Sequence, residues 1–121
     1  MRSLIWLTVF AVLYVAVVVP NLSVAYIDFG DGNYLYISRQ IADGVTLYRD
    51  ILAPQPPCHL LIGAALIKIG RLFGDTVEYE LYTVRAFSIL LHLATMVLIW
   101  ALGLRLFRRV SIALLAAAIY I

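Results

Sequence analysis

The chain has 121 residues, of which 64% are hydrophobic and only 13% are charged, and its formal net charge is +2. Soluble domains usually carry about 25% charged residues, so this composition argues against a soluble domain. No basic run with interleaved aromatic residues indicates a nucleic-acid partner. The single cysteine, Cys58, excludes an internal disulfide, and no Cys/His cluster has zinc spacing. We expect an all-α integral membrane protein.

The first apolar block predicts a membrane span over about 4–20, ending at Pro20. The flanking Arg2 and the small residues at 23–25 also resemble a cleavable signal peptide. Further apolar segments follow, which favours a retained anchor. Either interpretation places the chain from residue 21 onward outside the cytoplasm.

A second span is predicted over about 83–105, and a basic cluster of Arg105, Arg108 and Arg109 marks its end. Under the positive-inside rule this cluster lies in the cytoplasm, so the span runs from outside to inside. Residues 110–121 then start a further span, but about 20 residues are needed to cross a bilayer. We therefore expect the sequence to be the N-terminal fragment of a longer membrane protein.

The middle apolar block, 57–73, decides the topology. If it crossed the membrane, the basic cluster would emerge on the wrong side. Its uninterrupted apolar run is short, and Lys68 and Arg71 follow it at once. We predict a helix on the outer membrane surface, started by the Pro56-Pro57 pair, within an external loop over about 21–82.

The same loop contains a second predicted amphipathic helix, over about 33–43. Its Tyr34, Ile37 and Ile41 share one helical face, which we expect to rest on the membrane. Asp43-Gly44 supplies a C-terminal stop.

Two aspartates, Asp28 and Asp31, follow the first span and are candidates for a general base. A carboxylate held at a membrane surface is partly desolvated, which makes it a better proton acceptor. The alternative is an Asp/Gly turn in which Asp31 or Asn33 is the N-cap of the next helix.

Other polar side chains are candidate substrate contacts. Tyr48-Arg49-Asp50 could bind a polar or anionic group, but the segment alone favours a rigid linker with an Arg49–Asp50 contact. His59 follows the proline pair. Arg85 lies near the outer end of the second span, where a charge needs a partner, a ligand or a route to the interface. His92, deeper in that span, is more typical of an interhelical hydrogen bond than of a ligand.

The order and spacing of these elements resemble the start of the type C glycosyltransferases, in particular the protein O-mannosyltransferases, the lipid A aminoarabinose transferases and their bacterial relatives. The corresponding residues here are Asp31 or Asp28, Tyr34, Tyr36, Arg39, Gly44, Tyr48-Arg49-Asp50, Pro56-Pro57 and Arg85. The family's Asp-Glu pair is not present as such, because Asp31 is followed by Gly32. Either aspartate therefore stays a candidate for the base.

The resemblance implies a sugar transfer with inversion from a polyprenyl-phosphate donor to a hydroxyl of a lipid, glycan or protein acceptor. It implies a loop aspartate as base, with Arg85 or Arg39 near the leaving phosphate. The further candidate substrate contacts are Tyr34, Tyr48-Arg49-Asp50, Pro57 and, from its place beside the proline pair, His59. No cofactor is implied with certainty, and a divalent metal stays open.

The resemblance also places the chain among membrane lipids of the bacterial plasma membrane, with the loop on the periplasmic or outer face. This part alone would be inactive. The alternative function is a non-catalytic polytopic membrane protein, such as a subunit of a transporter or of an envelope-assembly complex.

Overall fold

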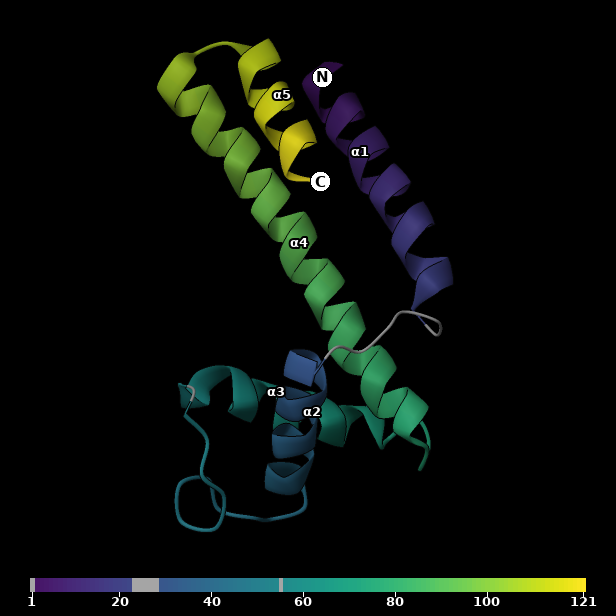
Figure 1. Ribbon diagram of the computed structural model, residues 1–121. Helices are drawn as coiled ribbons and strands as arrows, with labels where there is room; N and C mark the ends of the chain where they lie inside the picture. Colours follow the sequence, from purple (N-terminus) through teal and green to yellow (C-terminus); the bar gives the residue numbers. More distant parts are fainter. Residues whose placement is uncertain (1, 23–28, 55) are drawn as a thin grey trace. The chain divides into compact units, whose positions relative to one another are not determined.

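The computed structural model describes residues 2–22, 29–54 and 56–121, and within these ranges it contains helices and no β-strand. The elements are α1 (Arg2–Val18), a 3-10 turn (Val19–Asn21), α2 (Phe29–Ala42), α3 (Pro57–Gly70), α4 (Val77–Phe107) and α5 (Val110–Tyr120), as drawn in Figure 1. The predicted all-α class is confirmed.

The helices divide between two compact units. Unit 1 combines Met1–Leu22 with Phe87–Ile121, and unit 2 is Ser23–Ala86. Unit 2 covers nearly the same residues as the predicted external loop, and the beginning of α4 belongs to it.

Two helical stretches are long and apolar enough to cross a membrane, judged by length and composition. They are Ser3–Asn21, with 19 residues, and Val77–Phe107, with 31. The second is longer than the predicted span because its first turn, which contains Glu78 and Glu80, extends the helix into unit 2. Acidic residues in a first turn are favourable because the N-terminal end of a helix carries partial positive charge.

Helix α2 begins at Phe29, four residues before the predicted helix start at 33. Asp31 and Asn33 therefore lie inside the helix, and the prediction that one of them is its N-cap is wrong. The predicted stop is confirmed. Gly44 has a φ of 97°, its N–H donates to the carbonyl of Ile41, and the N–H of Val45 donates to that of Gln40. This is the Schellman ending, for which glycine is favoured.

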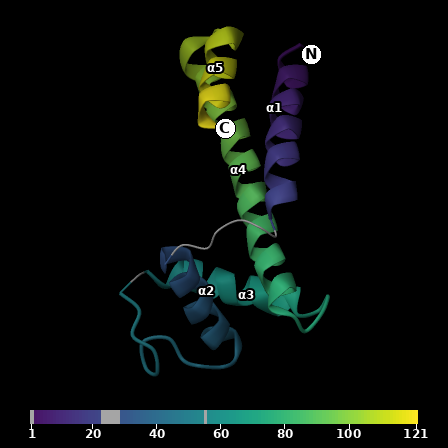
Figure 2. The ribbon, with the colours of Figure 1, turned by 45° about the vertical axis from the view of Figure 1, so that its right-hand side comes forward.

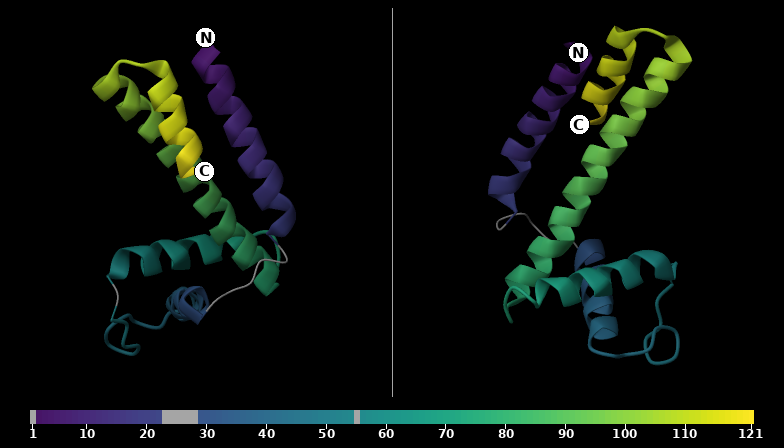
Figure 3. Two further views of the ribbon diagram at one scale, coloured as in Figure 1. Left: turned by 45° about the horizontal axis from the view of Figure 1, so that its top comes forward. Right: turned by 180° about the vertical axis from the view of Figure 1, so that it is seen from behind.

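Within unit 2, α2 crosses α3, as Figure 3 shows. Ile37 of α2 is buried with Leu60 of α3 and Ala53 of the loop, and Tyr34 and Ile41 pack against the same cluster. The predicted apolar face of α2 is thus confirmed, but it packs on protein instead of resting on lipid. The α3 helix starts at Pro57 as predicted and ends at Gly70, three residues before the predicted end.

The helices of unit 1 meet through small side chains. Gly103 of α4 approaches Ala113 of α5 so closely that an added Cβ would lie 3.0 Å from the Ala113 Cα. Ala113 and Ala117 are fully buried, and Ala117 packs with Leu7 of α1 and Met96 of α4. Figure 2 shows the three helices of this unit side by side. Such small-residue contacts are characteristic of helix pairs in membranes.

We predict that Gly70→Ala destabilises unit 2 by about 1–3 kcal/mol, the usual cost of overpacking. The added Cβ would lie 2.7 Å from the carbonyl oxygen of Tyr79 and 2.9 Å from the Cα of Glu80, so backbone has to move. Thermal unfolding of the purified protein measures the change, with Ala65→Ser on the exposed face of α3 as control. An unchanged melting temperature for Gly70→Ala would contradict this close approach.

Candidate functional site

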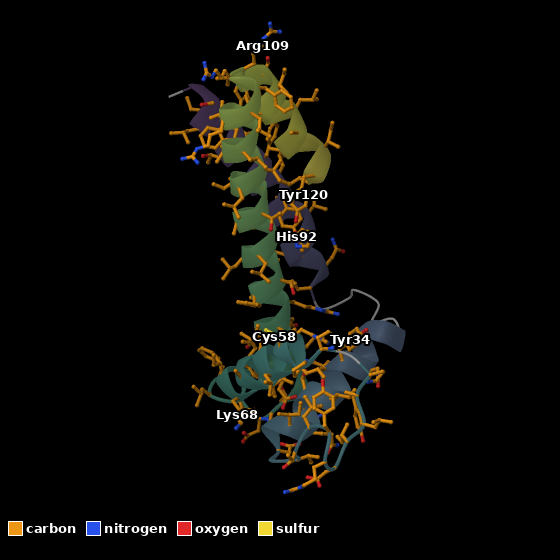
Figure 4. All side chains as sticks on the ribbon, turned by 90° about the vertical axis from the view of Figure 1, so that its left-hand side faces the viewer. Tyr34, Cys58, Lys68, His92, Arg109 and Tyr120 are labelled. Atoms are coloured by element: carbon orange, nitrogen blue, oxygen red, sulfur yellow. The ribbon has the colours of Figure 1, made fainter. Side chains whose placement is uncertain are left out.

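The start of α2 and the start of α3 bring two predicted site residues together. The rings of Tyr34 and His59 meet edge to face, with centroids 4.9 Å apart. His59 lies in the first turn of α3, which begins at Pro57, and its side chain is exposed, whereas Tyr34 is half-buried. Figure 4 labels Tyr34 and the neighbouring Cys58 on these two helices.

Of the two candidate bases, Asp28 lies outside the described residues. The backbone of Asp31 belongs to the first turn of α2. His59 lies against Tyr34, which follows Asp31 by three residues along the backbone of α2.

The Tyr48-Arg49-Asp50 segment forms a turn held by its own polar groups. Arg49 donates from Nε and Nη2 to the two carboxylate oxygens of Asp50, at 2.9 and 2.8 Å, and the N–H of Thr46 donates to Asp50 Oδ2 at 3.0 Å. The Arg49 guanidinium and the Thr46 N–H lower the pKa of Asp50 below its ordinary value. The predicted Arg49–Asp50 contact is confirmed, so Arg49 pairs within the turn instead of with Tyr34 or His59.

Backbone strain accompanies this turn. Tyr48 has a φ of 68°, a left-handed conformation that is unfavourable for a non-glycine residue. Its N–H donates to the carbonyl of Ile51, and the N–H of Asp50 donates to that of Thr46. These bonds hold the strained residue in place, with the side chain of Tyr48 exposed.

An ion-pair chain joins the ends of three helices in unit 2. Arg39 of α2 approaches Glu80 of α4, with 3.3 Å between Nε and Oε2. The other Glu80 oxygen accepts from Nε of Arg71, directly after α3, at 2.7 Å, and Arg71 Nη1 donates to Asp43 Oδ1 at 2.6 Å. We call Arg39, Glu80, Arg71 and Asp43 the arginine–carboxylate chain. The hydrogen bonds to Asp43 and to Glu80 raise the pKa of Arg71 above its ordinary value.

The sequence did not single out Glu80 or Arg71 as functional residues. Neither residue stands at an unusual position, because acidic residues are common in the first turn of a helix and basic residues are common at its end. What distinguishes Glu80 is burial, because only 5% of its side chain is exposed. Burial of this kind depends on how α2, α3 and α4 pack, which no local pattern shows.

The two remaining candidates lie on α4. Arg85 is half-buried and has an interaction partner. His92, in unit 1, stacks between Tyr14 and Tyr120, with ring centroids 5.8 Å from each (Figure 4). The Nδ1 atom of His92 lies 3.2 Å from the Ser88 carbonyl oxygen of the same helix, and its contacts with Tyr14 of α1 and Tyr120 of α5 are ring stacking. Among the described residues, no group of three or more His, Cys, Asp or Glu side chains is arranged to hold a metal ion.

We expect the amide of Thr46 to report the titration of Asp50. Because the folded-state pKa of Asp50 is lowered, the carboxylate stabilises the turn above its ordinary pKa of about 3.9, and this is lost as the pH falls through the folded-state value. An NMR titration should place the midpoint below about 3.9, and Arg49→Gln should raise it. Asp75→Asn is the control. A midpoint unaffected by Arg49→Gln would contradict the pairing.

Comparison with protein-family models, curated proteins and solved structures finds no match to this chain.

Proposed function

We propose that the chain belongs to a membrane glycosyltransferase that uses a polyprenyl-phosphate-linked sugar as donor. The observation that carries the proposal is the contact between Tyr34, a residue of the resemblance, and His59, which lies beside the Pro56-Pro57 pair of the resemblance. The helix that presents Tyr34 also carries Asp31, one turn earlier. An aromatic ring and an imidazole at one place suit the binding of a sugar. The backbone position of Asp31, in the same helix, suits a base that activates a hydroxyl.

Membrane insertion is supported by the way in which unit 1 packs. Its helices meet through Gly103, Ala113 and Ala117, while large apolar side chains are exposed on the outside. These exposed residues include Leu4, Ile5, Val12, Leu13, Leu90, Leu98, Leu102, Leu115 and Ile119. Water does not tolerate apolar surface on this scale, whereas lipid tails do.

Unit 2 carries an apolar surface of its own on α3. One face of this helix, with Leu60, Ala64 and Ile67, is buried in unit 2. The residues Leu61, Ile62, Ile69, Leu72 and Phe73, on α3 and just after it, are exposed. A helix that is apolar on both sides suits a position between protein and membrane surface. This supports our proposal that α3 lies at the outer surface.

In the proposed reaction, Asp31 or Asp28 takes the proton of the acceptor hydroxyl. The acceptor oxygen then forms a bond to the anomeric carbon of the sugar. The bond from that carbon to the phosphate oxygen breaks, and its electron pair leaves with the polyprenyl phosphate. Because attack and departure occur on opposite faces, the configuration inverts. A positioned general base contributes about 10²–10⁴-fold to such a step.

We predict that Asp31→Asn or Asp28→Asn lowers the rate of sugar transfer by about 10²–10⁴-fold in the protein expressed from its complete gene. The amide keeps the size of the side chain but does not accept the proton. Transfer from a polyprenyl-phosphate sugar to a hydroxyl acceptor is measured, with Asp75→Asn as a matched control outside this segment. Wild-type rates in both variants would refute the catalytic role.

The alternative function is a non-catalytic membrane protein, in which the tyrosine and proline segments only pack. It predicts that the unmodified protein transfers no sugar from any polyprenyl-phosphate donor. The same assay therefore separates the two functions. The glycosyltransferase predicts sugar transfer by the unmodified protein and loss of that transfer in an aspartate variant.

The single native cysteine tests the topology directly. Cys58 is exposed at the start of α3, so we expect a membrane-impermeant maleimide to label it from outside intact cells. A Cys58→Ser, Arg108→Cys variant places the only cysteine in the turn between α4 and α5, which we expect to be labelled only after the membrane is opened. Labelling of Cys58 from the cytoplasmic side alone would overturn the proposed orientation.

A further inference from the structure

The arginine–carboxylate chain holds its two arginines unequally. Arg71 makes contacts of 2.7 and 2.6 Å with two carboxylates, whereas Arg39 makes a single contact of 3.3 Å with Glu80. The side chain of Arg39 is also the more exposed, at 42% against 30% for Arg71. Of the two arginines in the arginine–carboxylate chain, Arg39 is therefore the one that can bind a further anion.

Glu80 is held so that it orients Arg39. Its side chain is 5% exposed, and its second oxygen is bound by Arg71, which prevents the carboxylate from turning away. The contact with Arg39 is made at Nε, and the side chain of Arg39 is partly exposed. Terminal guanidinium nitrogens bind phosphate oxygens well, often two at a time.

We infer that Glu80 is a positioning residue that fixes the guanidinium of Arg39 to bind the phosphate of the polyprenyl-phosphate donor. This inference rests on the proposed function. It assigns a role in that function to Glu80, a buried residue that does not touch the substrate. When the bond between the anomeric carbon and the phosphate oxygen breaks, the electron pair stays on the phosphate. The fixed positive charge of Arg39 stabilises this leaving group, and no protein group has to reorganise.

The test is the binding of a polyprenyl phosphate, without sugar, to the purified protein expressed from its complete gene. We expect Arg39→Gln to weaken binding about tenfold to a hundredfold, as for loss of a charge-assisted hydrogen bond. Glu80→Gln should weaken binding about tenfold. The double variant should bind no more weakly than Arg39→Gln alone, because residues that act through one another are not additive.

Asp43→Asn is the matched control for a purely structural role. It removes the outer ion pair of Arg71 and should lower the melting temperature, while the affinity of the folded protein stays unchanged. If Glu80→Gln does not fold, Glu80→Asp keeps the buried charge but shortens the reach toward Arg39, and it should weaken binding as well.

Wild-type affinity in the folded Glu80 variant, or additive losses in the double variant, would overturn the positioning role. In either case, binding of the polyprenyl phosphate by the unmodified protein would still support the proposed glycosyltransferase function. If the unmodified protein binds no polyprenyl phosphate and transfers no sugar, the proposed function and this inference fail together.

Discussion

The carboxylate of Glu80 is the constraint on which the arrangement of unit 2 depends. It is nearly inaccessible to water and lies between Arg39 of α2 and Arg71, directly after α3. Removing one partner of a buried ion pair typically costs about 3–5 kcal/mol, because a charge is left without compensation. The three helix ends are therefore held together by charge as well as by the apolar contacts of Ala42, Ala64 and Ile67.

This constraint fixes α2, and α2 carries residues from both halves of the proposed reaction. Asp31 and Tyr34 lie near its start and Arg39 near its end. The eight-residue separation of Asp31 and Arg39 corresponds to about 12 Å along the helix axis, which is the scale of a sugar-phosphate head group. In the proposed reaction, one helix thus carries a candidate base near its start and a candidate phosphate-binding cation near its end. The turn around Asp50 is separately stabilised, which agrees better with a structural role for its arginine.

The local elements were readable from the sequence because each depends on neighbouring residues. Long apolar runs predicted the membrane-length helices, Pro57 predicted the start of α3, and Gly44 predicted the end of α2 through its positive φ. The start of α2 was misjudged. An aspartate such as Asp31 is favourable both as an N-cap and inside a first helical turn, so the sequence does not fix where the helix begins.

Composition and periodicity by themselves determined that the chain is helical, where its helices lie, and that apolar surface dominates it. Only the tertiary structure decided that the apolar face of α2, with Tyr34 and Ile41, packs on protein. It also decided that Glu80 and Arg71 form the centre of the arginine–carboxylate chain. The physical reason is the separation along the sequence over which each kind of interaction acts. Backbone preferences act over a few neighbours, whereas Arg71 reaches partners 9 and 28 residues away, and such pairs exist only once the helices have packed.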